Sequence, residues 1–129
     1  MTEHPNAIAV LRSFEAFNSG DLDALREYFT EDIVLRFAGN NAMSGTYRGR
    51  DAVMDALGRA IQGWGPHAEL EAILASDDHV MAFFHATGER DDKTMDLILA
   101  MPIKLNADAK LTDIWFLAND QRAYDQFWS

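Results

Sequence analysis

Apolar residues recur every three or four positions near the start of the chain, a spacing that predicts a helix with one apolar side. Pro5 suits the first turn of this helix, and Ser19-Gly20 ends it. The apolar positions between these limits are Ala7, Val10, Leu11, Phe14 and Phe17.

Two more helices and one strand are predicted in the first half of the chain. Asp21 can cap a short helix with Leu22, Leu25 and Phe29 on one side. The turn at residues 30–32 leads into a strand over residues 33–37, and residues 38–49, which contain Gly and Asn, are predicted to form a loop. A third helix follows, with apolar positions Val53, Leu57 and Ile61.

From residue 67 onward the pattern changes to extended runs separated by turn residues. These runs cover residues 67–75, 79–88, 94–105 and 110–118. The short turns favour an antiparallel meander, and Asn119-Asp120 can cap a last helix over residues 121–127. Helices followed by strands indicate an α+β domain with helices on one face of a sheet.

Composition and charge narrow the classes of function. The 129 residues are enough for one domain over residues 1–129, and no run approaches the ~20 apolar residues that cross a bilayer. We see no export signal and no cysteine, so we expect a cytoplasmic protein without disulfides. The formal net charge of −10 repels phosphate backbones, so we expect no nucleic-acid partner, and we expect no membrane partner either.

Three stretches carry a resemblance to a known superfamily. FNSGDLDALREYFTEDIVLRF, then GTYRGRDAVMDAL, then four strands closing with KLTDIWFLAND resemble the nuclear transport factor 2-like superfamily, and within it the SnoaL-like and ketosteroid-isomerase-like domains. The resemblance implies a cone-shaped α+β fold, in which three N-terminal helices pack in a strongly curved, mainly antiparallel sheet around an apolar-lined pocket. It implies no single activity, because this scaffold carries isomerases, cyclases, hydrolases and non-enzymes.

The resemblance also assigns the positions of the isomerase catalytic groups. Ketosteroid isomerases use an aspartate base, together with a tyrosine and a protonated aspartic acid that donate hydrogen bonds to the oxyanion. Matching the motifs places the base at Phe37, the tyrosine at Ser13 and the acid at Met101. Phenylalanine cannot accept a proton and a thioether cannot donate a hydrogen bond, so we expect the usual isomerase mechanism to be absent.

Alternation along the strands predicts which side chains face the pocket. If Met101 faces inward, two-residue turns at Asp92-Lys93 and Ala107-Asp108 place it opposite Phe84 and Ile114. The inward residues of the three strands are then almost all apolar: Val80, Ala82, Phe84, Ala86, Met95, Leu97, Leu99, Met101, Ile103, Thr112, Ile114, Phe116 and Ala118. With the helices included, we expect the pocket to be lined by Phe14, Phe17, Phe37, Phe84, Met101, Ile114 and Phe116.

Few polar residues are candidates for catalysis. Tyr28, Tyr47 and His67 lie on segments that can reach the mouth of the cone, and Asn41 lies on the predicted loop, so any catalytic polar group would come from this set.

His79 and His85 are six residues apart in one strand, about 20 Å, which is too far to share a metal. We therefore expect no metal site, and we find no motif for a cofactor.

Two functions of different classes remain open. The first is a binding protein that holds a small hydrophobic molecule in an apolar cone. The second is a cyclase- or isomerase-type enzyme that acts on a polyketide-, steroid- or terpenoid-like substrate through residues of the loops or the pocket mouth.

The outward-facing residues of the strands predict a homodimer. They form an apolar patch of Met81, Phe83, Ile98, Ala100, Pro102, Trp115 and Leu117, with Ala100 expected between His85 and Trp115. Soluble monomers rarely expose large apolar patches, and a two-fold interface is a common cover. The alternative is a monomer in which Asp96, Lys104 and Asp113 keep this face hydrated.

Overall fold

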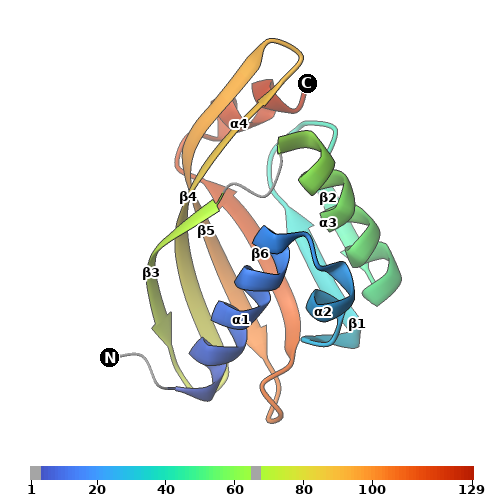
Figure 1. The fold of residues 1–129 in the computed structure, drawn as a ribbon, viewed down its shortest axis with the longest axis vertical. Helices are drawn as coiled ribbons and strands as arrows, with labels where there is room; N and C mark the ends of the chain where they lie inside the picture. The colour runs from blue at the N-terminus through green and yellow to red at the C-terminus, as the bar shows by residue number, and fades with distance from the viewer. Residues whose placement is uncertain (1–3, 65–67) are drawn as a thin grey trace.

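The structure is a computed structural model that describes residues 4–64 and 68–129. One curved, unclosed sheet of six strands carries the helices on its concave side (Figure 1). The elements in chain order are α1 (Pro5–Ser19), α2 (Leu22–Arg26), β1 (Phe29–Phe37), β2 (Gly45–Arg48), α3 (Arg50–Trp64), β3 (Ala68–Ala75), β4 (His79–Arg90), β5 (Lys93–Leu105), β6 (Leu111–Ala118) and α4 (Gln121–Phe127).

The strand order is β2-β1-β6-β5-β4-β3, so β3 to β6 form the predicted meander. All neighbouring strands are antiparallel except β1 and β6, which run parallel. This is the predicted α+β cone, with α1, α2 and α3 packed in a mainly antiparallel sheet (Figure 1). Within the described residues, no helix is long and apolar enough to cross a membrane.

The ends of α1 and the start of α2 follow the predicted signals. Pro5 occupies the first turn of α1, and Gly20 ends this helix at φ 74°, where its N–H donates to the carbonyl oxygens of Ala16 and Phe17. Glycine adopts this left-handed conformation without a steric penalty. The Asp21 side chain then accepts a hydrogen bond from the backbone N–H of Ala24 and caps α2.

The predicted loop over residues 38–49 is wrong in part, because it contains the strand β2. Thr46 and Tyr47 pair with Arg36 and Leu35 of β1, and Gly49 donates its N–H to the carbonyl of Ile33 at 2.8 Å. Strand β1 also begins at Phe29, four residues before the predicted start at Ile33. Its register with β6 shifts between Phe29 and Val34, so the apparent turn at residues 30–32 is an irregularity within a strand.

The β4–β5 hairpin differs from the prediction by two residues in register. Its turn lies at Asp91-Asp92, both with positive φ, as the tight primed turns of hairpins require. Met101 therefore pairs with Ala82, and Phe84 pairs with Leu99. Because side chains alternate with a period of two, a shift of two residues leaves every side chain on its predicted face.

The β5–β6 connection is longer than the predicted two-residue turn. The Asn106 side chain accepts hydrogen bonds from the backbone N–H groups of Asp108 and Lys110, which builds a loop over residues 106–110. Beyond the following register irregularity, Leu111 is 2% exposed, whereas Thr112 is only half-buried. The Thr112 hydroxyl donates to the carbonyl of Lys104, so the prediction that Thr112 faces the pocket is wrong.

The concave side of the sheet and the helices enclose the apolar core. The inward residues of β4 and β5 named above are buried, with the exception of the half-buried Met101. The alternation of side chains along β4 and β5 therefore predicted correctly which residues of these two strands face inward. Helix α4 contributes three aromatic residues to the same core, namely Tyr124, Phe127 and Trp128 just beyond its end.

Candidate functional site

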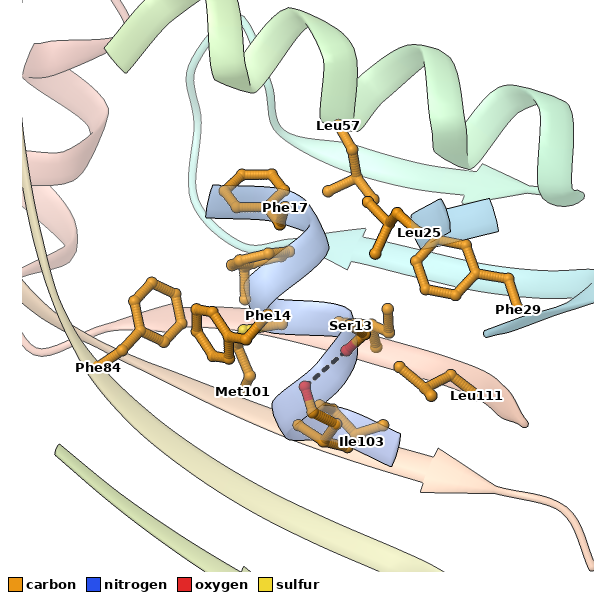
Figure 2. Close-up of a pocket in the computed structure, with 13 residues that line it drawn as sticks. Ser13, Phe14, Phe17, Leu25, Phe29, Leu57, Phe84, Met101, Ile103 and Leu111 are labelled. Carbon is orange, nitrogen blue, oxygen red and sulfur yellow. Dashed lines mark hydrogen bonds between the residues drawn. The ribbon is translucent and has the colours of Figure 1, made fainter. Parts of the chain in front are cut away.

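An apolar cavity lies between α1, the α2 and α3 region and the inner face of β4 to β6 (Figure 2). Of the seven residues predicted to line a pocket, the structure places six in its wall, namely Phe14, Phe17, Phe84, Met101, Ile114 and Phe116. The sequence reasoning missed several apolar wall residues, among them Val10, Leu25, Phe29, Leu57, Ile103 and Leu111. Five of these six residues belong to predicted helices or to the strand residues predicted to face inward. Periodicity alone, however, does not indicate which core residues border a cavity.

Phe37, the seventh predicted residue, does not line the cavity. Its ring is stacked on that of Phe116, with centroids 4.7 Å apart and an interplanar angle of 7°. Phe37 is 4% exposed, so it does face inward as predicted, but Phe116 stands between it and the cavity. Phe37 therefore lies on the predicted inner face of β1, but it is not part of the cavity wall.

Ser13 carries the one polar side chain among the described residues of the cavity wall. Its hydroxyl donates a 2.7 Å hydrogen bond to the carbonyl of Val10, one turn earlier in α1 (Figure 2). The donor is therefore already satisfied inside its own helix. No titratable side chain of the described residues lines this cavity, so its wall offers neither a charge nor a proton acceptor of useful basicity.

The cavity is small for an organic ligand. It offers about 40 Å³ to water-sized molecules, whereas pockets for drug-sized ligands measure roughly 300 Å³ or more. Eleven of its thirteen wall residues are buried, and the two half-buried ones are Phe14 and Met101. A larger molecule can therefore enter only if side chains of the wall move.

The tyrosines predicted as mouth residues are outside this cavity wall. Tyr47 donates its hydroxyl to the carbonyl of Met43 at 2.8 Å, and its ring packs edge-on against Phe37. The half-buried Tyr28 packs against the core, and its carbonyl accepts a hydrogen bond from the N–H of Leu111. His67 lies outside the described residues.

Asn41 holds the β1–β2 loop against α4. Its side-chain amide donates to the Asp125 carboxylate at 2.7 Å, and Gln121 donates to the same oxygen at 3.0 Å. These hydrogen bonds, that of Gln121 foremost, lower the pKa of Asp125. The role of Asn41 in the structure is therefore to join two segments at this end of the molecule.

His85 and Asp113 both lie on the outer face of the sheet, as the alternation along the strands predicts, but each side chain has a different partner. His85 forms a short hydrogen bond with Asp96, which raises the pKa of its imidazole. Asp113 instead pairs with Arg36 at 3.0 Å, and the Arg36 guanidinium lies 4.6 Å from the centre of the Trp115 ring. Across the part of the chain that the structure describes, no group of three or more His, Cys, Asp or Glu residues is arranged to hold a metal ion.

The apolar residues predicted for the outer face do lie there, but their order is different. Ala100 pairs with Phe83 and Leu117, so the prediction that it lies between His85 and Trp115 is wrong. The β5–β6 pair is also shifted by two residues, because Ile114 pairs with Ile103 and not with Met101 as predicted. Leu117 is 42% exposed, and Phe83, Ile98 and Trp115 are half-buried. The described helices lie on the opposite face of the sheet, so no helix or strand within residues 4–64 and 68–129 covers this patch (Figure 1).

The curved open sheet around three helices is the nuclear transport factor 2-like fold, which a solved NTF2-like protein of Burkholderia xenovorans shares at a TM-score of 0.82 and 24% identity, over 100% of this chain and 99% of that one. The family model described as SnoaL-like domain matches residues 10–120. The chain belongs to this family.

Relatives with known sequence or structure agree with the assignment. An uncharacterized protein of Mycobacterium tuberculosis is 30% identical over 132 residues, and the match covers 100% of both chains. The structure of Bal32a, from a soil-derived mobile gene cassette, matches with a TM-score of 0.91 at 31% identity and covers 97% of each chain. TerC co-crystallised with polyporic acid shares the fold with a TM-score of 0.81 at 19% identity, over 95% of this chain and 97% of that one.

Proposed function

We propose that this protein binds a small, uncharged, hydrophobic molecule in the cavity between α1 and the sheet. The observation that carries the proposal is the apolar character of the cavity wall. Among the described wall residues Ser13 alone is polar, and its hydroxyl donates a hydrogen bond to the carbonyl of Val10. A charged or strongly hydrated molecule would lose its hydration in this cavity without gaining a partner. Removal of apolar surface from water is the main driving force available there.

The enzymatic alternative is a cyclase or isomerase that acts on a polyketide-, steroid- or terpenoid-like substrate. Structures with this fold include a molecule described as a SnoaL-like polyketide cyclase, at 18% identity and a TM-score of 0.77, which supports only a common scaffold. Proton transfer requires an acid or base within hydrogen-bonding distance of the substrate. Tyr28 and Tyr47 are outside the cavity wall, so the described residues favour binding over catalysis.

Native mass spectrometry of the purified protein tests the proposal. We expect a complex with one apolar molecule per chain, which can be extracted and identified. Incubation of this molecule with fresh protein then separates the two functions, because a binding protein returns it unchanged and an enzyme converts it. A bound molecule that is charged or rich in hydroxyl groups would contradict the proposal.

A further inference from the structure

Phe14 is the wall residue best placed to open the cavity. It lies on α1 between the exposed residues Arg12 and Glu15, and it is half-buried, whereas eleven wall residues are at most 8% exposed. In Figure 2, Phe14, Phe84 and Met101 lie together at one end of the cavity, away from Phe29 and Leu111. An aromatic side chain at a solvent boundary can rotate without unpacking the core behind it.

The ring of Phe14 contacts the ring of Phe84 in the cavity wall. It meets the ring of Phe84 edge-on, with centroids 4.9 Å apart and an interplanar angle of 80°. Phe84 in turn meets Phe116 edge-on at 6.4 Å, and Phe116 is stacked on Phe37. The position of the Phe14 ring is therefore the outer end of a chain of aromatic contacts that continues into the core.

We propose that Phe14 is the gate of the cavity, and that the ligand carries an aromatic ring that replaces the Phe14 ring against Phe84. This inference rests on the proposed function, since it specifies how a hydrophobic molecule enters a cavity of about 40 Å³ and which molecules are preferred. An aromatic ring regains the edge-to-face interaction that is lost when Phe14 turns outward, and a saturated ring of the same size does not. Met101, the other half-buried wall residue, has a flexible thioether side chain that adapts to the incoming ring.

The direct test compares a naphthol with the matching decahydronaphthol, which has the same carbon skeleton without aromaticity. Calorimetric titration of the wild-type protein should show a preference for the naphthol of roughly two- to tenfold, the range that an aromatic pair contributes. The variant Phe14→Ala should bind both compounds more tightly and associate faster, because no ring has to be displaced. The preference itself should persist in this variant, since Phe84 provides it.

Two further variants separate gating from ring selection. Phe84→Leu should lose the preference for the naphthol, provided that circular dichroism shows the native fold. Leu11→Ala is the matched control, because Leu11 is a half-buried apolar residue of the same helix α1 and is not part of the cavity wall. It should bind both compounds as the wild type does.

Several outcomes would overturn the inference. Equal wild-type affinities for the two compounds would contradict ring selection, and unchanged binding in Phe14→Ala would contradict the gate, while either result leaves hydrophobic binding intact. If neither wild type nor Phe14→Ala binds either compound, the proposed function fails and this inference fails with it. Tighter binding in Leu11→Ala as well would show that the effect is not specific to the cavity.

Discussion

Phe37 is stacked on Phe116, with ring centroids 4.7 Å apart and planes at 7°. Phe37 stands at the position that the resemblance assigns to the catalytic base of ketosteroid isomerases. Phe116 lines the cavity and Phe37 supports it from behind. The residue that would abstract a proton in an isomerase therefore stabilises the cavity wall in this protein.

The first prediction is that the protein does not isomerise a Δ5-3-ketosteroid at an appreciable rate. A general base commonly contributes 10²- to 10⁴-fold to the rate, and Phe37 cannot act as one. Ser13 donates to Val10 and Met101 has no donor, so the oxyanion is not stabilised either. Conversion followed by ultraviolet absorbance should equal the uncatalysed reaction, and robust turnover by the wild type would show that the site has been misplaced.

The second prediction concerns stability. Phe37→Ala should lower the free energy of unfolding by about 3–5 kcal/mol, because it removes a buried ring from a stacked pair. Leu74→Ala is the control and should change stability by at most about 0.5 kcal/mol, since Leu74 is 66% exposed. Urea denaturation of both variants gives the comparison, and equal losses would contradict the assignment of Phe37 to the core.

The third prediction concerns the titration of His85. The hydrogen bond to Asp96 raises the pKa of His85 above its ordinary value of 6.5, with smaller contributions from the nearby charges of Asp96, Glu71 and Glu69. A nuclear magnetic resonance titration should show this elevated pKa in the wild type and a lower one in Asp96→Asn. An Asp96→Asn variant with the same His85 pKa would contradict the contact.

The sign of the linked stability change follows from the direction of the shift. Because the pKa of His85 is higher in the folded state, protonation favours folding, and this contribution is fully present below about pH 6.5. It is lost as the pH rises through the folded-state pKa. The pH dependence of unfolding should therefore contain a component that disappears in His85→Gln.

As the fourth prediction, we propose a homodimer through the outer face of the sheet. The outward residues along β5 are Asp96, Ile98, Ala100, Pro102 and Lys104, an apolar segment with an acid at one end and a base at the other. Such a strand is complementary to a second copy of itself in antiparallel orientation, which brings each Asp96 near the partner's Lys104. The patch around Phe83, Trp115 and Leu117 would be buried by the same arrangement.

Light scattering on dilute protein tests the dimer. The wild type should have twice the chain mass of 14.5 kDa, and Trp115→Glu should be monomeric. Asp96→Lys and Lys104→Asp should each weaken association, and the two together should restore it if the strands are antiparallel across the interface. A wild-type mass near 14.5 kDa would refute the proposal.

The sequence predicted which side chains of β4 and β5 face inward, but it did not predict the register in which the two strands pair. The β4–β5 turn lies at Asp91-Asp92 instead of Asp92-Lys93, and the resulting shift of two residues kept Phe84 and Met101 on the inner face. The choice between adjacent turns depends on backbone conformation at two aspartates, for which the sequence pattern holds no signal. In this hairpin, periodicity therefore predicted the face of each side chain but not its partner, whereas the irregularity at the start of β6 reversed the predicted face of Thr112.

The extent of the cavity also could not be predicted. Phe37 and Phe116 both face the inner side of the sheet, yet only Phe116 borders the cavity, because the Phe37 ring is stacked on the Phe116 ring. Strand β2 was missed since its four residues follow a segment rich in Gly and Asn, and they form a strand only by pairing with β1. Both features arise from tertiary contacts, which a local pattern does not contain.

Methyl-detected nuclear magnetic resonance during titration with a naphthol tests hydrophobic binding in the cavity most directly. The methyl signals of Met101, Ile103 and Ile114, which line the cavity, should shift in a saturable way. Those of the exposed residues Leu74 and Leu117 should stay in place. Saturable shifts of Leu74 and Leu117 with unchanged signals from the cavity would contradict the proposed site.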